Sequence, residues 1–206
     1  MTKFRNKYRI ESARAQWWNY AAEGAYFITI CTADRLPIFG QIIQKKMTLS
    51  PMGNIVHQEW NHSFEMRKEL CCDIVVIMPD HLHAILRIAP VEAHGCAPHV
   101  CAPHGCAPES ESLALETHSS APLPQNINFG VAYRPPKSIS SFVAGFKSSA
   151  TKKINEYRQT PGVAVWQSRF HDRIIREQKE YDRIFTYIEN NVENWNEDKQ
   201  TDMNSH

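Results

Sequence analysis

The chain has 206 residues, of which 42% are hydrophobic, so it is long enough to bury a core as one domain. It holds no apolar run of 18 residues, which excludes a membrane-spanning helix, and the segment Met1–Arg5 lacks the apolar stretch of a signal peptide, so we expect a cytoplasmic protein. The formal net charge of +1 hides an asymmetry: residues 91–130 hold four acidic residues and no Lys or Arg, whereas the remainder holds 23 basic and 18 acidic residues. This mildly basic remainder is compatible with a polyanionic partner and does not require one.

Basic and aromatic side chains dominate the N-terminal segment 3–20. Two interpretations stay open for it. It is either a solvated leader whose tryptophans pack on the domain, or a basic arm whose aromatic rings stack on the bases of single-stranded nucleic acid. In the second interpretation Arg5, Lys7 and Arg9 are candidate DNA-binding residues.

A strand and a helix are predicted next. Residues 25–32 are rich in β-branched and aromatic side chains and are bounded by Gly24 and by a turn sequence ending in Pro37, which favours a strand. Ser50 followed by Pro51 is typical of a helix start, with serine as the N-cap and proline at the first helical position. We predict that this helix runs to about Lys68 and has Ile55, Val56, Trp60 and Phe64 on its core side.

The stretch 74–88 places two histidines between two apolar runs, each with the length of a buried strand. Alternate residues of a strand share a face, so His81 and His83 point the same way, roughly 7 Å apart at their Cα atoms. Two imidazoles on a rigid strand can bind one metal ion when a third ligand comes from elsewhere. The plainer alternative is a pair of partly exposed histidines. The polar sequence Asp-His-Leu-His is unusual within so apolar a stretch, however, and this favours a functional role.

Residues 91–130 differ from the rest of the chain. They contain a five-residue repeat with the sequence Cys-Ala-Pro-His-Val or Cys-Ala-Pro-His-Gly, followed by Ser-, Glu- and Pro-rich sequence. Proline at every fifth residue excludes a helix or an interior strand. We therefore predict a single domain over 1–206 that is interrupted by a disordered, low-complexity insertion at 91–130.

An amphipathic helix is predicted over residues 138–155. Its apolar stripe consists of Ile139, Phe142, Val143, Phe146, Ala150 and Ile154. Lys147, Lys152 and Lys153 lie off this stripe. They are either solubilising surface residues or, on a helix poor in acids, contacts for a phosphate backbone, so they are further candidate DNA-binding residues.

The C-terminal part is predicted to form one or two short strands within 163–175 and a helix from about Glu177 to Trp195, followed by a flexible polar tail at 196–206. On this helix Tyr187 and Asn191 are four residues apart and share a face. A tyrosine on a helix is usually a half-buried residue that packs on the core and has no catalytic role. Placed beside the two histidines, however, a phenolate can act as a nucleophile on a phosphodiester, while two imidazoles and an amide oxygen hold a metal that acts as a Lewis acid.

These motifs resemble those of a known family. Pro79-Asp80-His81-Leu82-His83 looks like the HUH motif (His-hydrophobic-His) of the single-tyrosine transposases. The sequence from Trp166 to Glu177, followed by Tyr187-Ile188-Glu189-Asn190-Asn191, resembles the C-terminal signature of their REP-associated branch. A departure is Val192, where this family often has a proline after the asparagine.

The resemblance implies an α+β, ferredoxin-like fold with helices packed on an antiparallel sheet, a central HUH strand and a C-terminal helix that carries the tyrosine. It implies nicking and rejoining of single-stranded or hairpin DNA through a 5′-phosphotyrosine, supported by Mg²⁺ or Mn²⁺. By motif, Tyr187 is the catalytic nucleophile, and His81, His83 and Asn191 are the metal ligands. The sequence has no P-loop, in agreement with an enzyme that needs no nucleotide cofactor.

Two other functions compete with this hypothesis. One is a domesticated protein that binds hairpin DNA without cleaving it, although such a protein need not keep both histidines, the tyrosine and the asparagine. The other is a metal-dependent hydrolase that uses water instead of tyrosine. No membrane partner is expected, and the sequence leaves open whether the protein is a monomer or a homodimer.

Overall fold

The structure is a computed structural model that describes residues 3–4, 7–8, 22–88 and 136–195. Two short strands, β1 (Lys3–Phe4) and β2 (Lys7–Tyr8), pair near the N-terminus, so Lys7 lies in β2. The predictions for Arg5, Arg9, the insertion at 91–130 and the tail at 196–206 fall outside these residues. Within the described parts of the chain, no helix has the length and apolar character needed to cross a bilayer.

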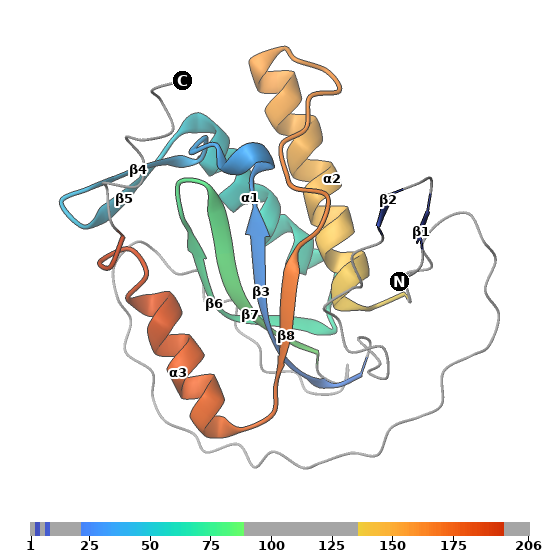
Figure 1. Cartoon of the computed structure of the whole chain (residues 1–206), viewed down its shortest axis with the longest axis vertical. Coiled ribbons are helices and arrows are strands. Elements are labelled where there is room, and N and C mark those ends of the chain that lie inside the picture. The colour runs from blue at the N-terminus through green and yellow to red at the C-terminus, as the bar shows by residue number, and fades with distance from the viewer. Residues whose placement is uncertain (1–2, 5–6, 9–21, 89–135, 196–206) are drawn as a thin grey trace.

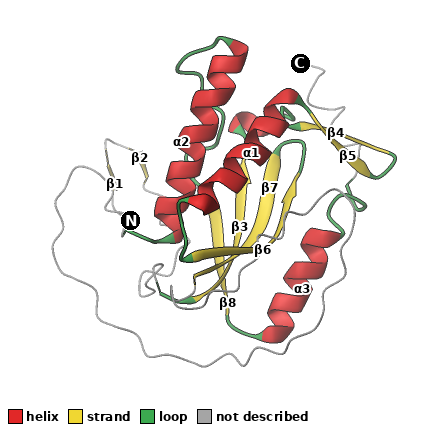
Figure 2. Cartoon of the chain, turned by 180° about the vertical axis from the view of Figure 1, so that it is seen from behind, coloured by secondary structure: helices red, strands yellow, loops and turns green. Residues whose placement is uncertain are grey.

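The described residues form an α+β domain around a four-stranded antiparallel sheet (Figures 1 and 2). The strands lie in the order β6-β7-β3-β8, so β7 is interior to the sheet. The chain follows the strand–helix–strand–strand–helix–strand order of the ferredoxin-like fold. The elements are β3 (Gly24–Cys31), α1 (Pro51–Glu65), β6 (Leu70–Ile77), β7 (His81–Ile88), α2 (Ile139–Arg158) and β8 (His171–Ile175). The predicted fold class, with a central HUH strand, is confirmed.

Both predicted helix starts carry serine caps. The backbone N–H of Gly53 donates to Ser50 Oγ at 3.0 Å, and that of Ser141 donates to Ser138 Oγ at 3.2 Å. Each bond satisfies a helical N–H that has no partner within the helix, which stabilises a helix by about 1 kcal/mol. The helix α1 ends at Glu65, slightly earlier than predicted, and α2 continues to Arg158.

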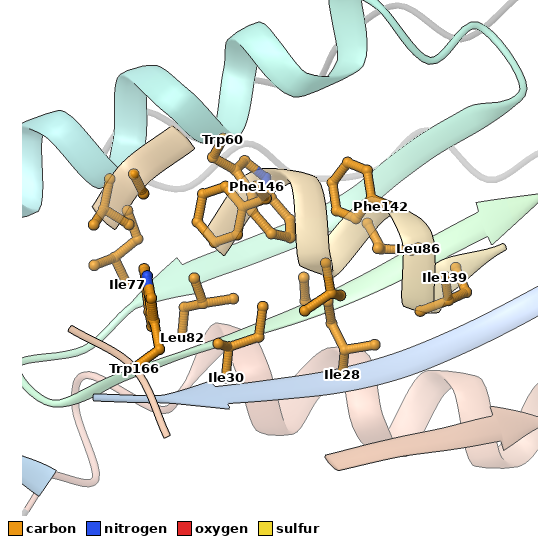
Figure 3. Packing of buried hydrophobic residues seen from close by; sticks show 14 of the residues in the cluster. Ile28, Ile30, Trp60, Ile77, Leu82, Leu86, Ile139, Phe142, Phe146 and Trp166 are labelled. Carbon is orange, nitrogen blue, oxygen red and sulfur yellow. The ribbon is translucent and has the colours of Figure 1, made fainter. Parts of the chain in front are cut away.

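The two faces of β7 have different partners. Leu82, Ala84 and Leu86 are fully buried in the cluster formed with α1 and α2, where Trp60 packs against Phe146 with ring centroids 5.1 Å apart (Figure 3). Large apolar side chains buried in this way each contribute about 1.5–3 kcal/mol. Because side chains alternate along a strand, His81 and His83 point to the other face.

A third helix, α3 (Gln178–Glu189), covers that other face (Figure 1). Ile184 and Ile188 are buried there against Ile85 of β7 and apolar residues of the neighbouring strands. The expected helix from Glu177 to Trp195 is therefore too long at its C-terminal end. Asn190 takes the C-cap position, since asparagine side chains compete with the helical backbone for hydrogen bonds and favour helix ends.

A hairpin between β3 and α1 was not expected from the sequence. It consists of β4 (Gly40–Ile43) and β5 (Lys46–Leu49), preceded by the short helix η1 (Ala33–Arg35). Its two turn residues, Gln44 and Lys45, both have positive φ values, 50° and 60°. Such turns usually contain Gly or Asn, so this sequence lacks the pattern by which a hairpin is recognised.

Candidate active site

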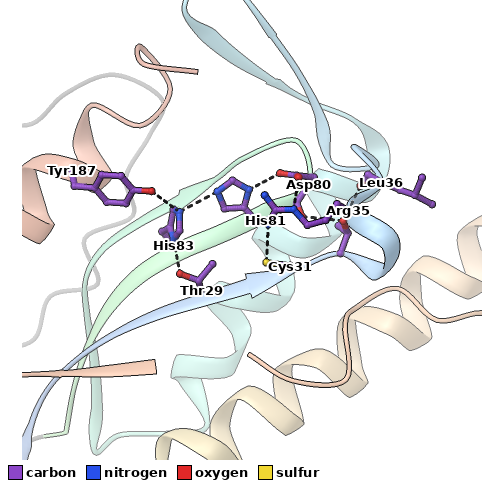
Figure 4. A network of polar contacts seen from close by, with 9 residues as sticks. Thr29, Cys31, Arg35, Leu36, Asp80, His81, His83 and Tyr187 are labelled. Atoms are coloured by element: carbon purple, nitrogen blue, oxygen red, sulfur yellow. Dashed lines mark hydrogen bonds and ion pairs between the residues drawn. The ribbon is translucent and has the colours of Figure 1, made fainter. Parts of the chain in front are cut away.

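The two histidines of β7 converge on one point (Figure 4). Their Nε2 atoms lie 3.1 Å apart, and both side chains are buried, with 5% of His81 and 6% of His83 exposed. The turn Pro79-Asp80 places His81 at the first position of β7, and the Met78 N–H closes this turn by donating to the His81 carbonyl at 2.8 Å. The strand thus fixes both rings on the face that α3 covers.

The Nδ1 atom of each ring is bonded to a neighbouring polar side chain. His81 Nδ1 lies 2.5 Å from Asp80 Oδ1, and His83 Nδ1 lies 2.7 Å from Thr29 Oγ1 on β3. Since an ionised carboxylate only accepts hydrogen bonds, His81 donates to Asp80 from Nδ1, and Nε2 is the ring nitrogen left on the side of His83. Metal-binding histidines are commonly oriented by a carboxylate, as His81 is by Asp80.

His83 stays neutral at physiological pH. Burial is the main cause that lowers the pKa of its imidazole to about 3, and the neighbouring His81 and Arg35 act in the same direction. Burial has this effect because the charged form loses solvation. A neutral imidazole keeps a lone pair for a metal ion.

The histidine pair has the chemistry and spacing of a divalent-metal site. Two nitrogens bound to the same ion at about 2.0–2.1 Å lie about 3 Å apart, close to the 3.1 Å between the two Nε2 atoms. Imidazole ligands suit ions such as Zn²⁺, Fe²⁺ and Ni²⁺, whereas Mg²⁺ and Mn²⁺ are bound mostly by oxygen, so either of these two ions would need oxygen ligands besides the two nitrogens. Among the residues described, no group of three or more His, Cys, Asp or Glu side chains could hold a metal ion, so a third ligand from these residues would have to be of another type.

Tyr187 of α3 reaches this pair. Its phenol oxygen lies 3.3 Å from His83 Nε2, and the residue is 52% exposed. Phe27 of β3 holds both rings, stacking on His83 at 5.3 Å between centroids and meeting Tyr187 edge-on at 6.3 Å. The arrangement leaves one side of the phenol open to solvent next to the two imidazoles.

Tyr181, two turns earlier on α3, is in a different environment. Its hydroxyl donates to Asp73 Oδ2 at 2.9 Å, and Asp73 is also paired with Arg87 at 2.7 Å. Burial and the neighbouring Asp73 carboxylate raise the pKa of the Tyr181 phenol well above its ordinary value. Tyr181 therefore anchors α3 to the sheet and is a poor source of phenolate.

Asn191 lies beyond the end of α3. Its backbone N–H donates to the Ile188 carbonyl at 3.2 Å in the turn that follows the helix. Within the parts of the chain that the structure describes, no hydrogen bond joins the Asn191 side chain to either histidine. The same turn brings Trp195 next to the site, with its ring centroid 5.9 Å from that of His81.

The chain has a relative in Haemophilus influenzae, an uncharacterized protein that is 32% identical over 188 residues, covering 91% of each chain. The chain belongs to the same family as this protein. No protein-family model matches this chain. The structure aligns with that of a REP-associated tyrosine transposase bound to a REP hairpin, with a TM-score of 0.51 and 15% identity over 90% of this chain and 80% of that one. The resemblance predicted from the sequence is thus confirmed at the level of the fold.

A second solved structure, from Deinococcus radiodurans R1, covers 88% of this chain and 97% of its own at 12% identity. Its TM-score of 0.37 is too low to support an inference about this protein.

The lysines of α2 lie on the layer that covers the sheet face opposite the histidines. Lys147 Nζ donates to the carbonyls of Gln167 and Arg169 at 2.7 and 3.1 Å, and Lys153 pairs with the buried carboxylate of Glu59. Lys152 is the most exposed of the three, with 78% of its side chain accessible. The structure therefore separates these lysines from the histidine pair and gives two of them structural contacts.

Sequence reasoning assigned no role to several residues that build the site. Asp80 directly precedes His81 in the motif, and this adjacency could have indicated the contact between the two side chains. Thr29, Phe27 and Arg35 carried no such indication, because their contacts depend on strand pairing and loop conformation. Trp195 was expected at the end of a longer helix and instead lies beyond α3, near His81.

Proposed function

We propose that this protein nicks and rejoins single-stranded DNA beside a hairpin, as in DNA transposition, with Tyr187 as the nucleophile. The observation that carries the proposal is the 3.3 Å approach of the Tyr187 phenol to His83, one of two histidines whose Nε2 atoms converge. The shared fold with a REP-associated tyrosine transposase bound to a REP hairpin supports the same function.

The reaction is a transesterification. The Tyr187 phenol releases its proton to solvent, which its half-exposed side chain contacts, and its oxygen forms a bond to phosphorus while the bond from phosphorus to the 3′ oxygen breaks. The departing 3′ oxygen takes up a proton and becomes a free 3′-OH. A 3′-OH that attacks the 5′-phosphotyrosine reverses these steps and rejoins the strand, so the phosphodiester energy is retained and no nucleotide cofactor is needed.

The proposed cofactor is Mn²⁺ or Mg²⁺, held by His81 and His83 with Asn191 as the third ligand. When bound, the ion supplies Lewis-acid stabilisation of the charge that develops on the phosphate. The histidines contribute a preformed pair of ring nitrogens on a rigid strand. Asn191 lies just after Asn190, the C-cap of α3, so its amide is on the segment that continues from the helix of the nucleophile.

The proposed partner is hairpin or single-stranded DNA. The basic residues Arg5, Lys7, Arg9, Lys147, Lys152 and Lys153 remain the proposed contacts to its phosphate backbone. Lys152 is the α2 lysine best placed to bind a phosphate without losing a structural contact, because its pairing with Glu156 is a long, exposed one at 4.0 Å. Both a monomer and a homodimer are compatible with the proposal.

The test is a denaturing-gel assay with labelled single-stranded DNA that carries a hairpin from the flanks of the gene, with Mn²⁺ or Mg²⁺ present. We expect a metal-dependent covalent band for the wild-type protein and none for Tyr187→Phe. Cleavage that survives in Tyr187→Phe would indicate a hydrolase that uses water. Tight hairpin binding without an adduct in either metal would indicate a DNA-binding protein without cleavage activity.

A further inference from the structure

The loop after β3 is joined to the turn that precedes the first histidine. The backbone N–H and the hydroxyl of Thr32 both donate to the Asp80 carbonyl at 2.9 Å, and the Phe39 N–H donates to the Pro79 carbonyl at 3.0 Å. Residues 32–39 and the turn Pro79-Asp80 are therefore one hydrogen-bonded unit. Any side chain fixed by this loop has a defined position relative to His81.

Arg35 is fixed in that loop at two points. Its Nε lies 2.9 Å from Asp80 Oδ2, and its Nη1 donates to the buried Cys31 Sγ at 2.8 Å. Asp34 and Arg35 have φ values of 52° and 57°, a left-handed conformation that is uncommon for residues other than glycine. Strained backbone of this kind persists only where surrounding contacts hold it, and it is frequent at functional sites.

The contacts continue from Arg35 to the proposed metal ligands. Asp80 uses its second carboxylate oxygen to accept from His81 Nδ1 at 2.5 Å, and only about a tenth of the Asp80 side chain is exposed. The far side of the same imidazole ring carries the Nε2 atom that faces His83. Figure 4 shows this line of contacts from Arg35 through Asp80 and His81 to His83 and Tyr187.

We propose that Arg35 is a positioning residue that orients His81 through Asp80 and thereby sets the affinity of the histidine pair for a divalent metal. The inference rests on the metal site of the proposed function. Arg35 acts on one carboxylate oxygen and leaves the other to His81, so the carboxylate plane is fixed by two different partners. Removing the guanidinium frees Asp80 to rotate and loosens the His81 ring.

Mn²⁺ affinity in the absence of DNA measures this role separately from catalysis. Outer partners of metal-binding histidines typically contribute about 10–100-fold in affinity. We expect Asp80→Asn to weaken Mn²⁺ binding by this factor and Arg35→Gln to weaken it about 10-fold. The double variant should bind no more weakly than Asp80→Asn alone, because the positioning effect of Arg35 on His81 passes through Asp80.

Two further variants separate positioning from general destabilisation. Arg35→Lys keeps the charge but offers one compact donor in place of the planar fork, so we expect an affinity between those of the wild type and Arg35→Gln. Arg67→Gln is the matched control, because Arg67 also pairs with a carboxylate, Glu69 at 2.6 Å, but far from the histidines. This control should bind Mn²⁺ as the wild type does.

The short Asp80–His81 hydrogen bond also allows a measurement on the metal-free protein. In the metal-free protein, the proton NMR signal of His81 Nδ1–H should lie far downfield and move upfield in Arg35→Gln, while it stays in place in Arg67→Gln. An unchanged signal together with wild-type Mn²⁺ affinity in Arg35→Gln would overturn the inference. So would effects of Arg35→Gln and Asp80→Asn that multiply in the double variant.

These results are independent of the nicking activity. If the wild-type protein forms no DNA adduct but the variants show the expected pattern of Mn²⁺ affinities, the proposed function fails and the inference about Arg35 stands. If Tyr187-dependent adduct forms and Arg35→Gln binds Mn²⁺ like the wild type, the inference fails and the proposed function stands.

Discussion

The phenol oxygen of Tyr187 and the Nε2 atom of His83 lie 3.3 Å apart, although 104 positions of sequence separate the two residues. Two structural features produce this approach. Side chains alternate between the two faces of the sheet along β7, so His83 points toward α3. Ile184 and Ile188 of α3 are buried against the sheet, which brings the neighbouring side chain of Tyr187 next to β7. The site therefore depends on the way α3 packs on the sheet as much as on the motif residues.

Tyr187→Phe should abolish the covalent adduct and leave hairpin binding intact, since it removes the attacking oxygen and keeps the ring that packs on Phe27. Tyr181→Phe is the matched control. It should retain the adduct and lose about 1–3 kcal/mol of stability, because Asp73 loses a charge-assisted hydrogen bond. Gel assays and urea denaturation of both variants check these outcomes. An adduct that disappears only in Tyr181→Phe would reverse the two assignments.

Mn²⁺ should quench the fluorescence of Trp195, because a paramagnetic ion at the histidine pair would lie close to the indole ring that contacts His81. We expect part of the total tryptophan emission to fall as Mn²⁺ is added. The same titration should show little quenching in His81→Ala, which lacks a ligand, and in Trp195→Phe, which lacks the reporter. Equal quenching in all three proteins would place the metal elsewhere.

Much of the fold follows from local sequence patterns. All six side chains of the stripe predicted for 138–155 are buried in α2, and Ser50 caps α1 as predicted. The shared face of His81 and His83 follows from strand alternation alone. These predictions succeed because periodicity and caps involve residues close in sequence.

The parts that could not be predicted depend on tertiary contacts. The packing of α3 on β7 brings together segments that are distant in sequence. No pattern within either segment predicts this packing. The contact of Arg35 with Asp80 requires a left-handed backbone at Asp34 and Arg35, for which the sequence has no glycine. The end of α3 at Asn190 depends on competing hydrogen bonds of similar strength, so the helix predicted to Trp195 was too long.

Glu59 should make the stability of the protein depend on pH. Burial raises the pKa of this carboxyl, but the hydrogen bonds from Lys153 and Ser149 and the charge of Lys153 together bring it below its ordinary value of 4.5. A pKa that is lower in the folded state contributes stability above pH 4.5, and this contribution is lost as the pH falls through the folded-state value.

Glu59→Gln should therefore be less stable than the wild type near neutral pH, and the difference should shrink on acidification below about pH 4. Thermal denaturation of both proteins from neutral pH to below about pH 4 measures this difference in stability. The control Glu65→Gln removes a carboxylate whose side chain is 71% exposed, and it should change neither stability nor its pH dependence by much. A constant difference between Glu59→Gln and the wild type at all pH values would show that the buried pair does not titrate with folding.

Deleting residues 92–128 should leave folding and nicking largely unchanged. The strands and helices of the ferredoxin-like domain all lie within 22–88 and 136–195, and the candidate active site uses residues of these ranges only. The melting temperature and the yield of covalent adduct should match those of the full chain. Loss of either would show that the insertion contributes to the domain or to DNA binding.

The most direct test of the proposed chemistry is to identify the residue that carries the DNA. The wild-type protein is incubated with hairpin DNA and Mn²⁺, digested with a protease and a nuclease, and the DNA-linked peptide is sequenced by mass spectrometry. We predict a 5′-phosphonucleotide on Tyr187 within the peptide that contains Ile188. A link to another tyrosine, or cleavage products with no linked peptide, would contradict the assignment of Tyr187 as the nucleophile.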